Sequence, residues 1–166
     1  FSISPAEAAA MDPQQRLLLE WGYLSLHAAK LNSDPADSGA GVFVAIIATE
    51  FGDLLASSPD AESVFAFASQ GGAIAVASGR ISYSLGLQGP CATINTACSS
   101  SLVAMHATAS ALTLEECTLG LSATVNLMLT PACTVSLAIG SFTSPKGRCF
   151  TFDQRADGYV RCEACG

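Results

Sequence analysis

Charged side chains are scarce in this chain, and their balance excludes one class of partner. Only 13% of the 166 residues are charged, and the formal net charge is −7. An average soluble domain has about 25% charged residues. Because nucleic acids are bound by a basic surface, the acidic balance argues against a nucleic-acid partner.

Long uninterrupted apolar runs are also missing, although half of the residues are hydrophobic. No charge occurs from residue 81 to 114 or from 117 to 145. A membrane span needs about 20 apolar residues, but polar residues and prolines interrupt both stretches, among them Gln88, Pro90, Asn95, Asn126 and Pro131. Buried strands and helices of an α/β core therefore account for both stretches, and no membrane segment is expected.

Histidine is rare, which weakens any prediction of a metal centre. His27 and His106 are the only two, and they do not have the paired spacing of a zinc site. The segment "CEAC", Cys162–Cys165, has redox or zinc spacing, but a single CxxC is a weak signal. We expect no metal and no bound cofactor.

The seven cysteines indicate a reducing compartment, with cytoplasm or plastid favoured. Most of them lie in apolar sequence, at positions 91, 98, 117, 133, 149, 162 and 165. The pattern predicts mostly buried, inert thiols. No signal peptide is visible. Since the first residue is Phe1, we expect a segment of a longer polypeptide and leave targeting open.

The clearest predicted helix lies in "MDPQQRLLLEWGYLSLHAAKL". Asp12 is a good N-cap, Pro13 suits the first helical position, and Gln15 completes a capping-box pattern. Helical spacing predicts a buried face formed by Leu17, Trp21, Leu24, Ala28 and Leu31. His27 lies beside this stripe and is interpreted as a surface histidine.

Strands and helices alternate through the rest of the chain. The β-branched run at 42–47 predicts a strand covered on both faces. A short strand is predicted at 91–96 and another strand at 117–126. A helix is predicted at 99–113, with Leu102, Met105 and Ala109 on one side, and another from Pro131. This order predicts an α/β class with a layered, largely buried sheet.

The last charged cluster contains Asp153, Arg155, Asp157 and Glu163. A catalytic carboxylate is conceivable there, but a network of turns and salt bridges is the commoner structure. We assign these residues no catalytic role. The preceding "FTF", from Phe150, predicts the start of a strand.

Cys98 stands between a predicted strand and a predicted helix, in "INTACSSSLVAMH". This order is that of a nucleophile elbow, in which the side chain stands up at a strand-to-helix junction. Helix N-terminal amides favour a thiolate and can hold a developing oxyanion. On spacing alone, a buried structural cysteine before an ordinary helix is the commoner case.

Four stretches of the chain, taken together, favour a nucleophilic over a structural role for Cys98. They are "FSISPAEAAAMDPQQRLLLEWGY", "GRISYSLGLQGPCATINTACSSSLVAMH", "VNLMLTP" and "GRCFTFDQRADGYVRCEACG". In order and spacing they resemble the ketosynthase (β-ketoacyl synthase) domain of modular, type I polyketide synthases. The resemblance covers nearly all of the chain.

The resemblance implies a thiolase-like layered fold, a homodimer and an acyl-thioester condensing activity. Cys98 matches the nucleophile that accepts an acyl group from the phosphopantetheine arm of an acyl carrier protein. That group then undergoes decarboxylative Claisen condensation with a malonyl-type extender. The strand at 91–96 would lie near the dimer axis, and the backbone amide of Cys98 would supply one oxyanion donor.

The resemblance also implies two histidines, in "HGTGT"-like and "GHxEAAAG"-like motifs, and neither motif occurs in these 166 residues. We therefore expect residues 1–166 to be the N-terminal part of a ketosynthase domain, inactive on its own. His106 lies in the helix after the nucleophile, and we assign it no catalytic role.

Several positions depart from the family pattern. The family usually has Asp at Asn95, Asn at Gly72, a glycine pair at Ala123–Thr124 and "RGEG" where this chain reads "RCEA". Loss of glycine at Cys162 and Ala164 matters if those positions need positive φ or a close backbone approach. These departures fit a divergent branch or a relaxed constraint on activity.

Two alternatives remain open at this point. One is a non-catalytic, ketosynthase-derived subunit with a structural or interaction role in a larger assembly, since a half sheet exposes an apolar face. The other is a different thiolase-fold enzyme, such as a condensing enzyme of fatty-acid elongation. "MDPQQRLLLE" and "FDQRADGY" favour the polyketide branch over the fatty-acid branch.

Overall fold

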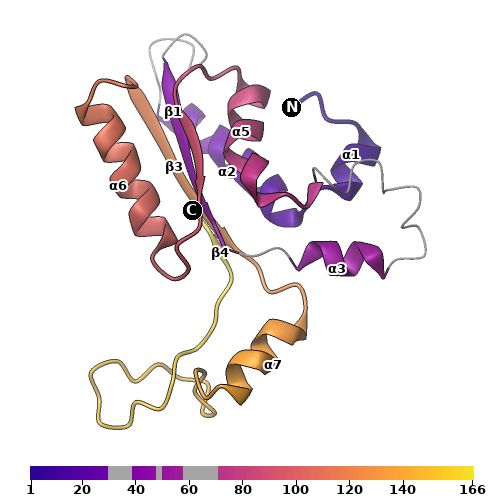
Figure 1. The fold of residues 1–166 in the computed structure, drawn as a ribbon, viewed down its shortest axis with the longest axis vertical. Helices are drawn as coiled ribbons and strands as arrows, with labels where there is room; N and C mark the ends of the chain where they lie inside the picture. The colour runs from indigo at the N-terminus through magenta and orange to yellow at the C-terminus, as the bar shows by residue number, and fades with distance from the viewer. Residues whose placement is uncertain (30–38, 48–49, 58–70) are drawn as a thin grey trace. The chain divides into compact units, whose positions relative to one another are not determined.

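The computed structural model describes residues 1–29, 39–47, 50–57 and 71–166 (Figure 1). The described chain forms two compact units. The first contains Phe1–Asn126 together with Ala164–Gly166, and the second contains Leu127–Glu163. Each unit is described below by itself.

The first unit is built around a four-stranded sheet with strand order β2-β1-β3-β4. β1 pairs in parallel with β2 and with β3, and β3 pairs in antiparallel with β4. Its elements are α1 (Pro5–Ala10), α2 (Pro13–Ala28), β1 (Ala40–Ile46), α3 (Phe51–Ala56), a 3-10 turn η2 (Ile74–Val76), α5 (Ala77–Leu85), β2 (Cys91–Ile94), α6 (Ser100–Thr113), β3 (Leu119–Asn126) and β4 (Ala164–Cys165).

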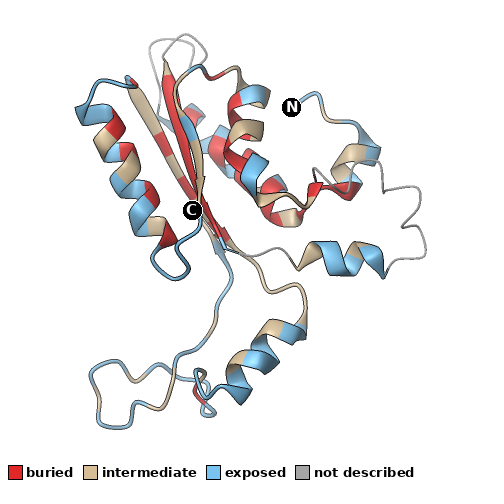
Figure 2. Cartoon of the chain, in the orientation of Figure 1, coloured by how far each residue is buried: buried red, intermediate tan, exposed pale blue. Residues whose placement is uncertain are grey.

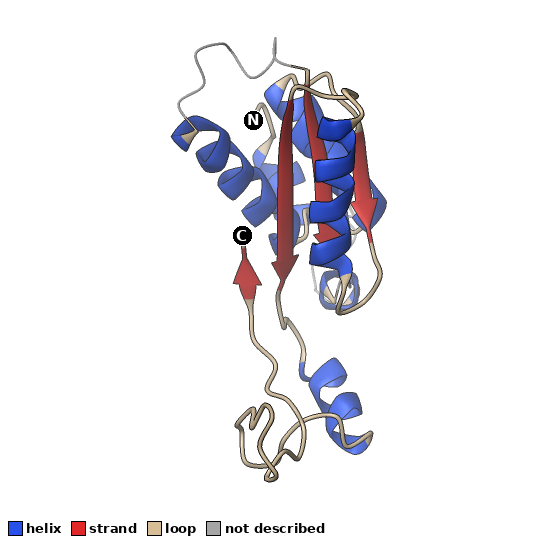
Figure 3. Cartoon of the chain, turned by 90° about the vertical axis from the view of Figure 1, so that its left-hand side faces the viewer, coloured by secondary structure: helices blue, strands red, loops and turns tan. Residues whose placement is uncertain are grey.

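Helices cover both faces of this sheet. Figures 1 and 3 show α6 on one face and α2 with α5 on the other. Every residue of β1 is consequently buried, as Figure 2 shows. The predicted α/β class and the strand covered on both faces are thus confirmed.

The α6 side of the sheet is closely packed because small residues meet there. Buried Phe43 and Ala45 of β1 form a cluster with Ala104 and Ala111 of α6. A Cβ on Gly120 of β3 would lie only 2.4 Å from Cγ2 of Thr108. Glycine at this position therefore sets how closely α6 approaches the sheet.

Helix α2 begins as the sequence predicts. Asp12 is the N-cap, its Oδ1 accepts a hydrogen bond of 2.8 Å from the amide of Gln14, and Pro13 is the first helical residue. The prediction of a capping box is wrong. The Gln15 side chain reaches across to another segment, donating to the carbonyls of Gly71 (3.0 Å) and Ala73 (3.1 Å).

The predicted buried face of α2 is also wrong. Trp21 is 49% exposed and Leu24 is 51% exposed, while Leu31 lies outside the described residues. The buried side chains are Gln14, Gln15, Leu18, Leu19 and Leu26, with Gly22 among them. The helix has apolar residues on both sides, and hydrogen bonding lets the two glutamines enter the core. His27 is exposed, as predicted, and stacks on Tyr23.

The second unit contains α7 (Pro131–Ile139) and a long connection. Thr130 and Pro131 are the N-cap and first residue of α7. The strand predicted from Phe150 is wrong, because residues 151–155 form turns instead.

The charged network predicted in this connection is confirmed. Arg155 pairs with Asp153 at 2.8 Å, and Lys146 pairs with Asp157 at 2.9 Å. Glu163 Oε1 accepts from the amide of Met128 at 2.7 Å. Hydrogen bonding to Arg155 lowers the pKa of Asp153, so this carboxylate is held in its charged form.

The predicted burial of the cysteines is wrong in most cases. Cys117 is buried, and Cys133 and Cys165 are half-buried. The other four are exposed, namely Cys91, Cys98, Cys149 and Cys162. Cys91 belongs to β2, whereas Cys98, Cys149 and Cys162 lie in turns and connections, which are mostly at the surface.

Candidate active site

Cys98 lies in a tight turn between β2 and α6. β2 ends at Ile94, and α6 begins at Ser100 with Ser99 as its N-cap. Ala97 has φ of +54°, a left-handed conformation that costs energy for a residue with a Cβ. The strand–turn–helix order predicted around Cys98 is therefore present, and the left-handed residue immediately precedes the cysteine.

Two serines hold the turn from inside. Ser100 Oγ donates to the carbonyl of Ala97 at 2.6 Å and accepts from the amide of Thr96 at 2.8 Å. Ser99 Oγ donates to the carbonyl of Thr96 at 2.8 Å. These bonds compensate for the strained backbone at Ala97 and leave the Cys98 side chain exposed.

Asn95 connects the turn to the end of β1. Its Oδ1 accepts from the amide of Ala97 at 3.1 Å, and its Nδ2 donates to the carbonyl of Ile47 at 2.9 Å. The amide thus uses both its acceptor and its donor, and it bridges two segments 48 residues apart. Sequence reasoning treated Asn95 only as a mild departure from the family pattern. An Asn just after a strand is a turn signal that pointed to part of this role.

A small pocket of about 150 Å³ opens beside Cys98. Its walls come from the ends of β1 and β3, from β4 and from the first turn of α6. The lining residues are Ala45, Ile47, Ala97, Cys98, Ser100, Ser101, Thr124, Val125, Asn126 and Ala164. Sequence reasoning identified Cys98 but missed Thr124 as a wall of the same pocket, because only the parallel pairing of β1 with β3 places it there.

Cys98 lies directly before the N-cap of α6. α6 is 14 residues long, and no side chain caps its N-terminus at Ser99. The partial positive charge of a helix N-terminus stabilises an anion, whether a thiolate or a developing oxyanion.

The other candidate residues lie elsewhere. His106 is exposed on α6, eight positions beyond Cys98. Cys162 and Cys165 belong to different units. Burial, and then the negative charge of Glu20, raises the pKa of the Cys165 thiol, which disfavours a reactive thiolate. Among the described residues, no group of three or more His, Cys, Asp or Glu side chains has the arrangement of a metal site.

The glycine departures near Cys165 prove conformationally harmless. Neither Cys162 nor Ala164 has a positive φ. Glycine is not required at these two positions for backbone conformation.

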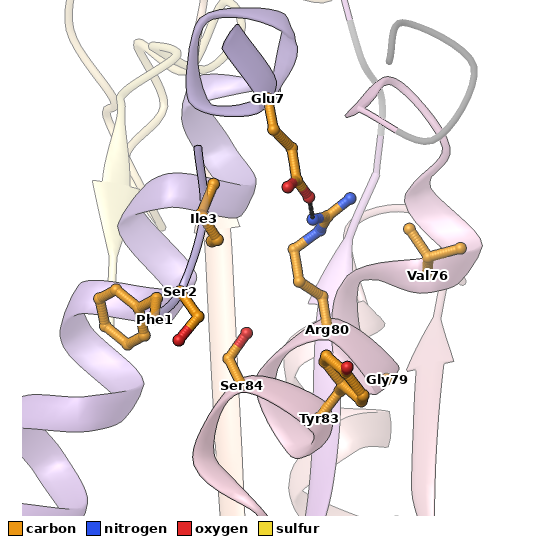
Figure 4. Close-up of a pocket in the computed structure, with 9 residues that line it drawn as sticks. All are labelled: Phe1, Ser2, Ile3, Glu7, Val76, Gly79, Arg80, Tyr83 and Ser84. Atoms are coloured by element: carbon orange, nitrogen blue, oxygen red, sulfur yellow. Dashed lines mark hydrogen bonds and ion pairs between the residues drawn. The ribbon is translucent and has the colours of Figure 1, made fainter. Parts of the chain in front are cut away.

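A larger pocket of about 380 Å³ lies apart from Cys98 and shares no lining residue with its pocket. Figure 4 shows Arg80 of α5 directed at Glu7 of α1. The two side chains pair at 2.8 Å, and Arg80 Nε also donates to Gln15 Oε1 at 2.9 Å. Through these two contacts, Arg80 links α5 to α1 and α2. Its positive charge is compensated by Glu7.

Fold and site together define a class: layered α/β proteins that hold a cysteine at a strand-to-helix elbow. The profile of the family described as "Beta-ketoacyl synthase, N-terminal domain" matches residues 1–166. The chain belongs to the β-ketoacyl synthase family, and the resemblance inferred from its sequence is confirmed.

Curated relatives are polyketide synthases. The chain is 44% identical over 170 residues to one component of the phenolphthiocerol/phthiocerol polyketide synthase of Mycobacterium tuberculosis. It is 38% identical over 164 residues to the reducing polyketide synthase PKS1 of Cochliobolus heterostrophus. These matches cover 100% and 98% of the chain, but only 11% and 6% of the relatives.

Solved ketosynthases share the fold. The ketosynthase from module 6 of the bacillaene synthase of Bacillus subtilis 168 superposes with a TM-score of 0.81 at 34% identity. The match covers 99% of this chain and 27% of that one. A ketosynthase domain for oxazolomycin from Streptomyces albus gives a TM-score of 0.77 at 28% identity. The predicted thiolase-like layered fold is thereby confirmed for part of a domain.

The described residues contain no helix with the length and hydropathy needed to cross a bilayer.

Proposed function

We propose that this chain supplies the acyl-accepting cysteine of a ketosynthase in polyketide synthesis. The elbow at Cys98 carries the proposal, because its strained turn, the uncapped start of α6 and the adjoining pocket meet at one thiol. Family membership supports the same chemistry. Residues 1–166 would then be the N-terminal part of the ketosynthase domain.

The proposed reaction is a thioester exchange. Cys98 Sγ attacks the carbonyl carbon of an acyl group held on the phosphopantetheine arm of an acyl carrier protein. A new carbon–sulfur bond forms at Cys98, the bond to the carrier sulfur breaks, and the carrier leaves as a thiol with the proton that Cys98 gave up. The amide of Cys98 and the dipole of α6 would stabilise the oxyanion.

Condensation follows in this proposal. The carbanion that a malonyl-type extender forms on loss of carbon dioxide attacks the carbonyl carbon of the cysteine-bound acyl group. A new carbon–carbon bond forms, the bond from that carbon to Cys98 Sγ breaks, and Cys98 leaves as a thiolate that takes up a proton. The two histidine motifs implied for this step are not in the 166 residues. We therefore propose that other parts of the polypeptide provide them and that this chain provides the acyl-enzyme step.

The acyl carrier protein and a second copy of the chain are the proposed partners. β2 is an edge strand of the four-stranded sheet. An open edge can pair with another strand, which supports the proposal that residues 91–96 lie near a dimer axis.

Mass spectrometry of the full-length protein tests the acylation. After incubation with an acetyl thioester of N-acetylcysteamine, the peptide that contains Cys98 should gain one acetyl group. Cys98→Ala should abolish this gain, and Cys91→Ala is the matched control, since Cys91 is also an exposed thiol. A folded protein whose Cys98 stays unmodified would contradict the proposal and favour the non-catalytic alternative.

A further inference from the structure

The pocket beside Cys98 is small for a ligand site. It encloses about 150 Å³, whereas pockets for drug-sized ligands enclose about 300–1,000 Å³. Because the pocket adjoins the Cys98 sulfur, the side chains that line it are candidates for controlling chain length.

The strand geometry shows which residues of β3 face this pocket. A Cβ on Gly120 would contact Thr108 of α6, whereas a Cβ on Gly22 of α2 would lie 3.3 Å from Cδ2 of Leu121. Because side chains alternate along a strand, Thr124 shares the side of Gly120 and faces α6. Val125 faces the opposite side, where it is buried.

Thr124 and Ala45 form one wall of the pocket together. The two residues are directly opposite each other in the β1–β3 pairing, and both line the pocket. Ala45 is only 3% exposed and packs in the cluster beneath α6. Space opened at Thr124 would therefore extend the pocket inward over Ala45.

The backbone of Thr124 is held in place. Its backbone exchanges two hydrogen bonds with Gly166, at 2.7 and 3.0 Å, and its Oγ1 lies 3.5 Å from the Gly166 carbonyl oxygen. A β-branched side chain also has a restricted χ1 angle. Such a residue acts as a rigid limit on space.

We propose that Thr124 is a specificity-determining residue that restricts Cys98 to short acyl groups. The inference rests on the proposed acylation of Cys98 and adds to it the class of substrate. Removal of the Thr124 side chain lengthens the pocket, so longer chains gain access to the thiol. The hydroxyl is not needed for this effect, since the limit is one of volume.

The test compares acylation rates of the full-length protein with acetyl and octanoyl thioesters of N-acetylcysteamine, followed by mass spectrometry. In wild type the acetyl group should load faster. Thr124→Gly should raise the octanoyl-to-acetyl ratio of second-order rate constants by about tenfold, in the range that hydrophobic pockets discriminate by size. Thr124→Val, which keeps the volume and removes the hydroxyl, should leave the ratio unchanged.

Ser122→Gly is the matched control, because Ser122 lies on the same side of β3, two residues before Thr124, and does not line the pocket. It should not change the ratio. If Thr124→Gly does not fold, Thr124→Ser decides the matter, with a smaller shift in the same direction.

An unchanged ratio in a folded Thr124→Gly, or in Thr124→Ser, would overturn the inference. An equal shift in Thr124→Val or in Ser122→Gly would also overturn it, because volume at residue 124 would not be the cause. Absence of acetyl loading in the wild type would instead refute the acylation of Cys98 itself, so the two failures are distinguishable.

Discussion

At the scale of single residues, the turn that presents Cys98 depends on side chains that do no chemistry. Ser100 and Asn95 together satisfy the backbone of Thr96, Ala97 and Ile47. Only with these bonds does the left-handed Ala97 become tolerable. The cysteine is thus held by polar neighbours of its own loop and by one contact with the end of β1.

Asn95→Asp is expected to destabilise the protein, although the family usually has Asp at this position. The change keeps the acceptor for the Ala97 amide and removes the donor to the Ile47 carbonyl. The loss of one such hydrogen bond costs about 1 kcal/mol in the free energy of unfolding. Urea denaturation measures it, with Asn95→Ala, which loses both bonds, as the more severe comparison. Equal stability of Asn95→Asp and wild type would contradict the role assigned to Nδ2.

Asp12 is the residue for which a pH dependence is expected. Burial raises the pKa of this carboxyl, and its hydrogen bonds to Gln14 and the charge of Arg16 lower it less. Its Oδ2 atom has no hydrogen-bond partner among the described residues. The native state therefore binds a proton more tightly than the unfolded state, which has the ordinary value of 3.8. The stability from this group is complete below that value and is lost as the pH rises through the raised pKa.

Asp12→Asn should remove this pH dependence while keeping the N-cap, because Asn caps helices as well as Asp. Thermal melts at several pH values above 3.8 would show a flatter profile for the variant and equal or higher stability at neutral pH. Asp12→Ala, which loses the cap, should be less stable at every pH. A variant profile parallel to that of wild type would show that Asp12 is not the titrating group.

At this scale, the turn shows which features can be predicted from the sequence. Cys98 and its strand–turn–helix setting follow from local order. The contacts of Asn95 with Ile47 and of Thr124 with the pocket do not, because each joins segments far apart in the chain. The capping box at Gln15 failed for the same reason, since a long-range acceptor competed successfully for its side chain.

At the scale of helices and strands, the sequence predicted the positions of β1 and α6 but not which face of α2 is buried. The strand expected at 42–47 is β1, Ala40–Ile46, and the helix expected at 99–113 is α6, Ser100–Thr113. In α6 the buried residues are Ser100, Ala104, Thr108 and Ala111, while Leu102 and Met105 are exposed. Periodicity predicts that a helix forms. When apolar residues lie on every side of the helix, however, periodicity does not predict which side packs against the sheet.

Gly120→Ala tests the close approach of α6 to β3. The new Cβ would lie 2.4 Å from Thr108 Cγ2, so the helix or the strand must shift. Overpacking of this kind costs about 1–3 kcal/mol, measurable by urea denaturation. Gly79→Ala in α5 is the matched control, because no atom of the described part of the chain lies within 4 Å of the added Cβ. It should stabilise the helix by up to about 1 kcal/mol. Similar effects of both changes would refute the packing argument.

At the scale of the whole molecule, the described units leave much apolar surface uncovered. α6 exposes Leu102 by 70% and Met105 by 58%, and α2 exposes Trp21 and Leu24 by about half. Contiguous apolar patches of this kind are normally covered by other protein. The chain spans 27% of the length of a solved ketosynthase that shares its fold, so its relatives have further polypeptide to provide such a cover.

Leu102→Lys in the full-length protein is therefore expected to destabilise the fold far more than the exposure of Leu102 in this unit indicates. Leu102 and Met105 are three positions apart and form one patch on α6. If that patch is covered, a buried lysine without a partner should lower the melting temperature by several degrees and reduce soluble yield.

Leu114→Lys is the control, because Leu114 is equally exposed, at 68%, but lies beyond the end of α6. Isolated apolar residues on a surface are normal, so this variant should melt near wild type. Equal melting temperatures for the two variants would show that the outer side of α6 is a true surface.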